Sequence, residues 1–274
     1  MIFLAVLAAT VSWMGLVGRP DPVSAADLRP ATAAAFERYI QGVQARVDER
    51  VTGHRNFLWV DDAPRRRTRV QRGEIVAERA AGARPVDVPD GLVHDFIGAV
   101  FIPRVTLGQA LAFVQDYDRH RDFYGPELVD SRIISRDGER FVLYMRLKKK
   151  KVITVVLNTE HDARFFPLDL TRWHSQSRTT RIAEVQDPGT PDEHELPAGT
   201  GYGLMWSLRT YWRFMERDGG VYVECQAVSL SRSIPWGLRW LISPIVSSLP
   251  RDSLANTLAA TRAGVRARAS RPPR

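Results

Sequence analysis

The chain has 274 residues, of which 44% are hydrophobic and 26% charged, so it can bury a core and is not expected to be disordered throughout. Lysine and arginine total 39 against 31 acidic residues, and the formal net charge of +8 favours anionic partners such as phospholipid headgroups, nucleic acid or acidic small molecules. The single cysteine, Cys225, excludes an intrachain disulfide and any cysteine-rich zinc site.

The amino terminus is an apolar run, Ile2–Val17, shorter than the roughly 20 residues of a bilayer-spanning helix and typical of a signal peptide. Val23 and Ala25 supply the small residues before a cut that leaves Ala26 as the new terminus. No lysine or arginine precedes the run, so an upstream start, a retained anchor and a buried helix are the alternatives. We expect residues 1–25 to be a signal peptide and the protein to be periplasmic or secreted, which argues against nucleic acid as the partner.

Residues 26–89 are expected to precede the main domain as a helix, short strands and a linker. Apolar residues recur at three- and four-residue spacing in Asp27–Arg50, which predicts an amphipathic packing helix; a membrane-proximal or partner helix is the alternative. Short strands are predicted at Phe57–Val60 and Gly73–Val76. Ala80–Pro89 carries a glycine and two prolines, as is typical of a linker.

From residue 90 the pattern changes to strands, interrupted by the predicted helix Thr106–Val114 and a helical turn at Asp118–Tyr124. Asp-Gly turns at residues 137–138 and 218–219 predict two hairpins. A last helix is predicted over Arg251–Arg268, with cations near its C-terminus, where they suit the helix dipole. The expected strands are Val93–Ile102, Leu128–Ser135, Arg140–Leu147, Val152–Thr159, Leu168–Val185, Leu204–Glu216 and Val221–Ser231.

This order of elements predicts an α+β domain over residues 90–269, followed by a basic tail, 270–274. Ile102–Val114, Asp116–Pro126, the Trp-x-Phe hairpin Tyr211–Val223 and Ile234–Trp236 resemble segments of the START and polyketide cyclase/dehydrase-like (SRPBCC) superfamily. The resemblance implies a helix-grip fold, in which a curved antiparallel β-sheet wraps around a long C-terminal helix, and a central cavity for a hydrophobic or amphipathic ligand. Members of the superfamily include lipid carriers and pigment-precursor cyclases.

Strand alternation predicts which side chains line such a cavity. If Trp212 and Phe214 point inward, Cys225, Ala227 and Ser229 face them from the next strand. Small residues opposite large aromatic ones leave volume, so a ligand chamber is expected, with a filled core as the alternative. The expected cavity residues are Phe113, Tyr117, Tyr124, Leu143, Met145, Val155, Leu157, Trp206, Thr210, Trp212, Phe214, Val223, Cys225, Ala227, Ser229 and Leu258.

Two further segments suit an entrance or a membrane surface. The apolar stretch 236–249 is expected to provide an entrance or membrane contact, with a lid or buried packing as alternatives. Lys148–Lys151 places four adjacent cations that attract anionic lipid or form a solvated turn. The expected entrance residues are Trp236, Trp240, Leu241 and Ile245.

No sequence motif of catalysis is present: HExxH, GxSxG, the Walker loop and GxGxxG are all missing, and the histidines are scattered. Neither a metal nor a cofactor is expected. The sequence therefore favours an exported binding protein that encloses a hydrophobic ligand. The first alternative is a cavity enzyme of cyclase, dehydratase or hydrolase type, with Tyr117, Tyr124, His120 or His174 as acid–base groups. The second alternative is a peripheral membrane adaptor without a small ligand.

Overall fold

Antiparallel pairing joins ten strands into one open sheet within the described part of the chain. The computed structural model describes residues 27–150, 154–233 and 239–270, and for Lys150 and residues 239–248 it describes the backbone alone. The main path runs β1-β3-β10-β9-β7-β6-β5-β4, while β2 pairs with β3 and β8 with β7. The strands are β1 (Val76–Arg79), β2 (Val86–Val88), β3 (Gly91–Pro103), β4 (Leu128–Asp137), β5 (Arg140–Lys150), β6 (Thr154–Pro167), β7 (Arg172–Gln186), β8 (His194–Glu195), β9 (Ser207–Arg217) and β10 (Gly220–Arg232).

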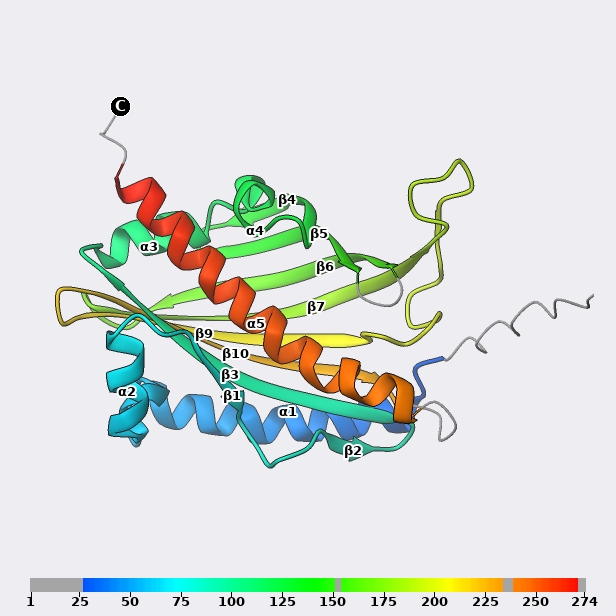
Figure 1. Ribbon diagram of the computed structural model, residues 1–274, viewed down its shortest axis with the longest axis horizontal. Coiled ribbons are helices and arrows are strands. Elements are labelled where there is room, and N and C mark those ends of the chain that lie inside the picture. Colours follow the sequence, from blue (N-terminus) through cyan, green and yellow to red (C-terminus); the bar gives the residue numbers. More distant parts are fainter. Residues whose placement is uncertain (1–26, 151–153, 234–238, 271–274) are drawn as a thin grey trace, which may run out of the picture.

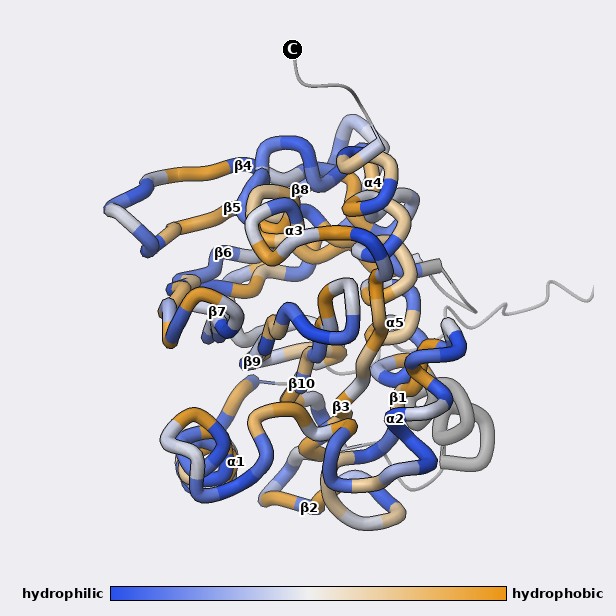
Figure 2. Tube along the Cα trace, turned by 90° about the vertical axis from the view of Figure 1, so that its left-hand side faces the viewer, coloured by the Kyte–Doolittle hydropathy of each residue, from blue (hydrophilic) through white to orange (hydrophobic). Residues whose placement is uncertain are grey.

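Helices cover both faces of this sheet (Figures 1 and 2). The longest helix, α5, crosses the face that we call the inner face, and α1 lies on the opposite, outer face. None of the described helices is both long and apolar enough to cross a membrane. The helices are α1 (Pro30–Val51), η1 (Trp59–Asp62), α2 (Pro64–Gln71), α3 (Leu107–Val114), η2 (Tyr117–Arg119), α4 (Arg121–Tyr124) and α5 (Arg239–Ala269).

Both predicted hairpins are present, although in the first one the turn is Gly138-Glu139, because Asp137 pairs with Arg140. In the β9–β10 turn, Asp218 and Gly219 take positive φ angles of 58° and 74°, and Arg217 pairs with Gly220. Such turns twist in the same sense as the strands they join, which explains the preference for Asp-Gly at this position. Local turn chemistry therefore sets the register of these strands.

The outer face is covered by the N-terminal segment. The predicted amphipathic stripe of α1 is confirmed: Phe36, Val43 and Val47 are buried against side chains of β3 and β10, among them Val93 and Val228. The segment also supplies β1 and β2, which pair with β3 along its length. Residues 27–88 thus extend the same sheet and its packing, rather than lying apart from it.

The strand predicted at Phe57–Val60 is wrong, because a 3₁₀ turn, η1, begins at Trp59. The backbone N–H groups of Trp59 and Val60 both donate to the Glu224 carboxylate, at 2.9 Å each. Their hydrogen bonds are therefore made to a side chain of β10 instead of to a neighbouring strand. Phe57 and Leu58 are nevertheless buried, as their apolar character requires.

On the inner face, α5 packs closely against β3. The strand approaches so near that a Cβ atom added at Gly98 would lie 2.8 Å from Leu258 Cδ1 and 2.9 Å from the Val76 carbonyl oxygen. Leu254 and Leu258 belong to the same buried cluster as Phe96 and Val100 of β3. This part of the inner face is therefore filled core, without room for a ligand.

We expect Gly98→Ala to lower the free energy of unfolding by about 1–3 kcal/mol, since the added methyl group overpacks a tight contact. Gly42→Ala is the matched control, because its Cβ would meet only Arg46 Nη1, at 3.7 Å, on the exposed side of α1. The control should stabilise α1 by about 0.5–1 kcal/mol. Urea unfolding of both variants checks this, and equal stability of the two would contradict the close packing.

Candidate functional site

The candidate site is the part of the inner face that α5 does not pack against. Helix α5 makes its main sheet contacts with β3, β1 and β10, and its other contacts with α3 and α4. Beyond this area, Met145 of β5, Ser177 of β7 and Trp212 of β9 are only partly buried. Their partial exposure shows that solvent reaches the inner face at these strands. We call this area the inner patch; it consists of Met145, Ser177, Thr210, Trp212, Ala227 and Ser229.

Pairing between β9 and β10 gives the inner patch its shape. Trp212 lies directly opposite Cys225, and Thr210 opposite Ala227. The predicted juxtaposition of a large aromatic side chain with small ones is therefore confirmed. Trp212 also stacks parallel to Phe214, with ring centroids 6.1 Å apart. Small side chains beside this ring leave apolar surface accessible on its flank.

Hydroxyl groups are spread among the apolar side chains of the inner patch. Ser177 pairs with Thr210 across β7 and β9, and Ser229 lies on β10 beyond Ala227. Within the described parts of the chain, none of these three hydroxyls has a hydrogen-bond partner. The hydroxyl of Thr179, by contrast, bonds to the backbone of Leu208. The free hydroxyls can each donate and accept a hydrogen bond, which gives an apolar surface a few polar contacts.

Three of the four predicted acid–base residues come together where α3 and α4 meet the inner face. The His120 ring lies 4.7 Å from the Tyr117 ring and 4.9 Å from the Tyr124 ring, measured between centroids. The Tyr124 hydroxyl bonds to Thr261 Oγ1 of α5 at 2.9 Å. Burial raises the pKa of both tyrosines and lowers the pKa of His120 to about 4. All three are therefore neutral at pH 7, as in a packed aromatic cluster.

The fourth predicted acid–base residue, His174, lies elsewhere. It pairs with Arg213 across β7 and β9 on the outer face and stacks on Phe166, with centroids 4.7 Å apart. Burial, and then the nearby Arg213 charge, lower its pKa. The sheet separates it from the cluster of Tyr117 and Tyr124. The four residues thus do not form one catalytic site.

Most of the expected cavity residues lie on the inner face. Ten of them belong to the cluster packed around α5 or lie against it: Phe113, Tyr117, Tyr124, Leu143, Met145, Trp212, Phe214, Val223, Cys225 and Leu258. Five more share that face by strand alternation: Val155, Leu157, Thr210, Ala227 and Ser229. Whether any of them binds a ligand stays a prediction.

The prediction that Trp206 lines the cavity is wrong. Its side chain belongs to the cluster under α1, with Phe36 and Val228, on the outer face. The expected alternation fails because β9 begins only at Ser207, after a loop that turns the Trp206 side chain away. Of the expected entrance residues, Trp236 lies outside the described residues, as do the side chains of Trp240, Leu241 and Ile245.

The hydroxyls of Ser177 and Thr179 were not among the predicted site residues. Side chains alternate between the two faces along β7, and Trp173 lies on the inner face, so Ser177 lies there too. Farther along, the pairing shifts between Glu160 and His161 of β6, and β7 carries one extra residue there, Thr180. Such a bulge reverses the alternation that follows it, and no local sequence signal places it.

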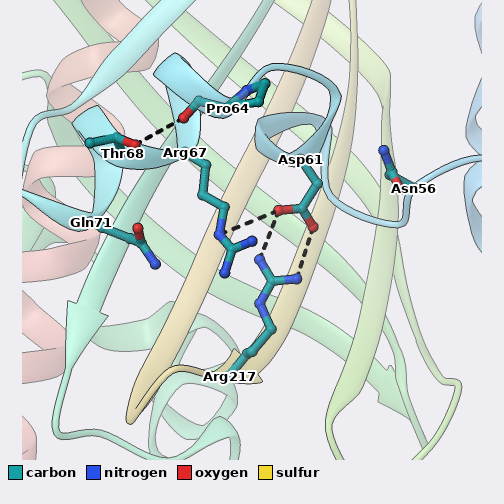
Figure 3. A pocket seen from close by; sticks show the side chains of 7 residues that line it. All are labelled: Asn56, Asp61, Pro64, Arg67, Thr68, Gln71 and Arg217. Atoms are coloured by element: carbon teal, nitrogen blue, oxygen red, sulfur yellow. Dashed lines mark hydrogen bonds and ion pairs between the residues drawn. The ribbon is translucent and has the colours of Figure 1, made fainter.

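A polar depression of about 530 Å³ lies beside η1 and α2 (Figure 3). The Asp61 carboxylate sits between two guanidinium groups: Arg217 binds it at 2.8 and 2.9 Å, and Arg67 lies 3.9 Å away. Arg67 also pairs with Asp218 at 3.3 Å. These opposite charges pair with one another and connect α2 to the β9–β10 hairpin. The depression therefore does not provide the apolar cavity that the sequence predicts.

The lysine run 148–151 begins at the end of β5, next to α5. Lys149 Nζ contacts both the Glu127 carboxylate and Ser253 Oγ of α5. Lys148 is exposed, and Lys151 lies outside the described residues. One lysine of the run therefore ties the sheet to the helix, while its neighbour remains available to solvent.

No family model and no curated protein matches the chain. Several solved structures, in contrast, match the chain. One is a STAR-related lipid transfer protein from Xanthomonas axonopodis, with 17% identity, 67% of this chain and 98% of that chain covered, and a TM-score of 0.45. A START superfamily protein from Mycobacterium smegmatis has 10% identity, coverages of 71% and 99%, and a TM-score of 0.39. The di-domain ARO/CYC StfQ from the steffimycin biosynthetic pathway has 14% identity, coverages of 65% and 53%, and a TM-score of 0.44.

These likenesses concern fold alone. An open antiparallel sheet with a long C-terminal helix across one face is a helix-grip arrangement, so the predicted α+β class is confirmed. What those proteins bind or catalyse is not thereby assigned to this chain.

Proposed function

We propose that this protein binds an amphipathic small molecule at the inner patch. The observation that carries the proposal is the partial exposure of Trp212 and Met145 on a face whose part beneath α5 is buried core. Ligand sites are mostly apolar and carry a few well-placed polar groups, which matches this aromatic surface with its free hydroxyls. A ligand with an apolar body and a few hydroxyl or carbonyl groups fits that composition.

A carrier or binding role is favoured over catalysis. The acid–base candidates Tyr117, His120 and Tyr124 are buried, and their pKa shifts keep all three neutral near pH 7. A general acid or base works best with a pKa near the working pH, which none of these groups has. Export remains part of the proposal and is supported by the apolar run Ile2–Val17 and the small residues that follow it.

Trp212→Ala is expected to reduce ligand retention at least about tenfold, because burying one aromatic side chain against a ligand contributes about 1.5–3 kcal/mol. Native mass spectrometry of the purified protein, followed by organic extraction, measures the retained molecule. An anilinonaphthalene sulfonate dye serves as the probe if the protein is purified empty.

Thr210→Phe tests the same patch without removing a packing residue, since the added ring fills the space beside Trp212. Ile134→Phe is its matched control, because Ile134 is 51% exposed on β4, away from the inner patch. Thr210→Phe should displace ligand and dye, and the control should not. Full retention by both inner-patch variants, with unchanged circular dichroism, would refute the proposal.

A further inference from the structure

The hydrogen-bonding groups at and around the inner patch are uncharged. The three free hydroxyls of the patch are neutral at any pH near 7. His161 of β6 lies on the same face, opposite Leu143. Burial lowers the pKa of His161 to about 4, so its imidazole is neutral at pH 7, and its Nε2 lies 2.9 Å from Thr159 Oγ1. These groups can donate and accept hydrogen bonds, but they cannot neutralise the charge of a ligand.

A second group of neutral hydroxyls lies beside the patch, next to Cys225. Cys225 lies opposite Trp212. Burial and, to a smaller extent, the nearby Cys225 thiol raise the pKa of the Tyr124 hydroxyl, which is bonded to Thr261 Oγ1 at 2.9 Å. The Tyr117 hydroxyl, in the same aromatic cluster, has no hydrogen-bond partner among the described residues. A ligand that extends from Trp212 past Cys225 therefore meets further neutral donors and acceptors.

The charged side chains that point to this face are engaged by other groups of the protein. In the described parts of β5, β6, β7, β9 and β10, strand alternation turns three of them inward: Lys149, Glu184 and Glu216. Lys149 Nζ contacts the Glu127 carboxylate. Glu184 and Glu216 accept backbone N–H groups from other parts of the chain, at 2.6–3.2 Å. None of these three charges is therefore available to pair with a ligand.

Helix α5 presents uncharged side chains to the same face. Those buried between residues 249 and 270 are Leu254, Leu258, Thr261 and Val265, together with Gly264. Moving a carboxylate or a phosphate from water into an apolar site is costly unless an opposite charge pairs with it. An uncharged hydroxyl or carbonyl loses much less, and hydrogen bonds to the free hydroxyls offset that loss. The inner patch thus differs from the basic surface of the chain, which favours anions.

We propose that the inner patch selects an uncharged alcohol or ketone with an apolar body over a carboxylate or a phosphate ester of similar size. The oxygen of the ligand bonds to hydroxyls such as those of Ser177 and Thr210, and its apolar body packs against Trp212. The inference rests on the proposed function, since it assigns the charge of the ligand at that same site. It excludes free fatty acids and phospholipids as ligands of the inner patch.

Two dyes that differ by one sulfonate group test this selection. N-phenyl-1-naphthylamine is uncharged at pH 7, and 8-anilinonaphthalene-1-sulfonate carries an anionic group on the same skeleton; both fluoresce strongly in apolar sites. Fluorescence titration of the full chain at pH 7 should give a dissociation constant at least about tenfold lower for the uncharged dye. Thr210→Phe should weaken the binding of the uncharged dye, which locates that binding at the inner patch.

Thr210→Lys and Thr210→Met separate the effect of charge from that of hydrophobicity, because the two new side chains are similar in length and only lysine is charged. Thr210→Lys supplies the missing counter-charge, so it should bind the sulfonate dye at least about tenfold more tightly than Thr210→Met does. Circular dichroism checks that both variants fold. The same preference between the dyes in both folded variants would overturn the proposal, as would a wild-type chain that prefers the sulfonate dye.

Native mass spectrometry with organic extraction covers the case in which the purified chain already holds a molecule. A retained uncharged alcohol or ketone would support the proposal. A retained carboxylate or phosphate ester would overturn the selection by charge but would support the ligand site itself. Binding of neither dye by an empty chain would contradict the ligand site, and this inference with it.

Discussion

Glu224→Ala is expected to lower the free energy of unfolding by about 3–5 kcal/mol, the usual cost of removing one partner of a buried ion pair. Glu224 is completely buried and binds Arg213 Nε at 3.0 Å, while it also accepts the two backbone N–H groups of η1. Arg213 is itself only 1% exposed. The substitution therefore leaves a buried guanidinium without its counter-charge and releases η1 from the outer face.

Urea unfolding at neutral pH measures this effect. Asp162→Ala is the control, since Asp162 pairs at 2.9 Å with Arg140, whose side chain is 55% exposed, and such surface pairs contribute about 0–1 kcal/mol. The double variant Arg213→Met with Glu224→Leu should recover much of the lost stability, because no unpaired charge remains. A loss below about 1 kcal/mol for Glu224→Ala would show that this pair does not hold η1 in place.

Acid is expected to destabilise the protein through its buried histidines. Burial lowers the pKa of His120 and of His161 to about 4, whereas an unfolded chain has histidines near pKa 6.5. The unfolded state therefore binds more protons between these two values. The stabilisation is fully present above pH 6.5 and is lost as the pH falls towards 4. Each histidine accounts for a loss of about 2 kcal/mol between pH 7 and pH 5.

The change of unfolding free energy with pH, rather than its absolute value, isolates this contribution. His161→Gln keeps a hydrogen-bonding group near Thr159 Oγ1, which lies 2.9 Å from His161 Nε2, and removes the titration. The variant should lose about 2 kcal/mol less than the wild type between pH 7 and pH 5. The same substitution at the exposed His54 is the control for replacing a histidine by glutamine. Identical pH dependence of His161→Gln and wild type would rule out a buried neutral His161.

Local sequence signals determined much of the fold. The Asp218-Gly219 turn sets the register of the β9–β10 hairpin because only a few residue types accept its positive φ angles. Helical periodicity placed α1, and strand alternation placed Trp212 opposite Cys225 on the inner face. These features depend on neighbouring residues alone, so the sequence by itself was sufficient to predict them, together with the α+β class.

Tertiary structure decided the features that depend on residues far apart in the chain. The 3₁₀ turn at Trp59 exists because Glu224, 165 positions away, accepts its N–H group. No local sequence signal predicts that the Trp206 side chain packs under α1 or that β7 has a bulge at Thr180. Which part of the inner face stays partly exposed depends on where α5 packs, and that contact is set by Leu258 meeting Gly98. Long-range hydrogen bonds and close packing override local propensity at these positions, so the limits of the candidate site, though not most of its residues, emerged only from the folded chain.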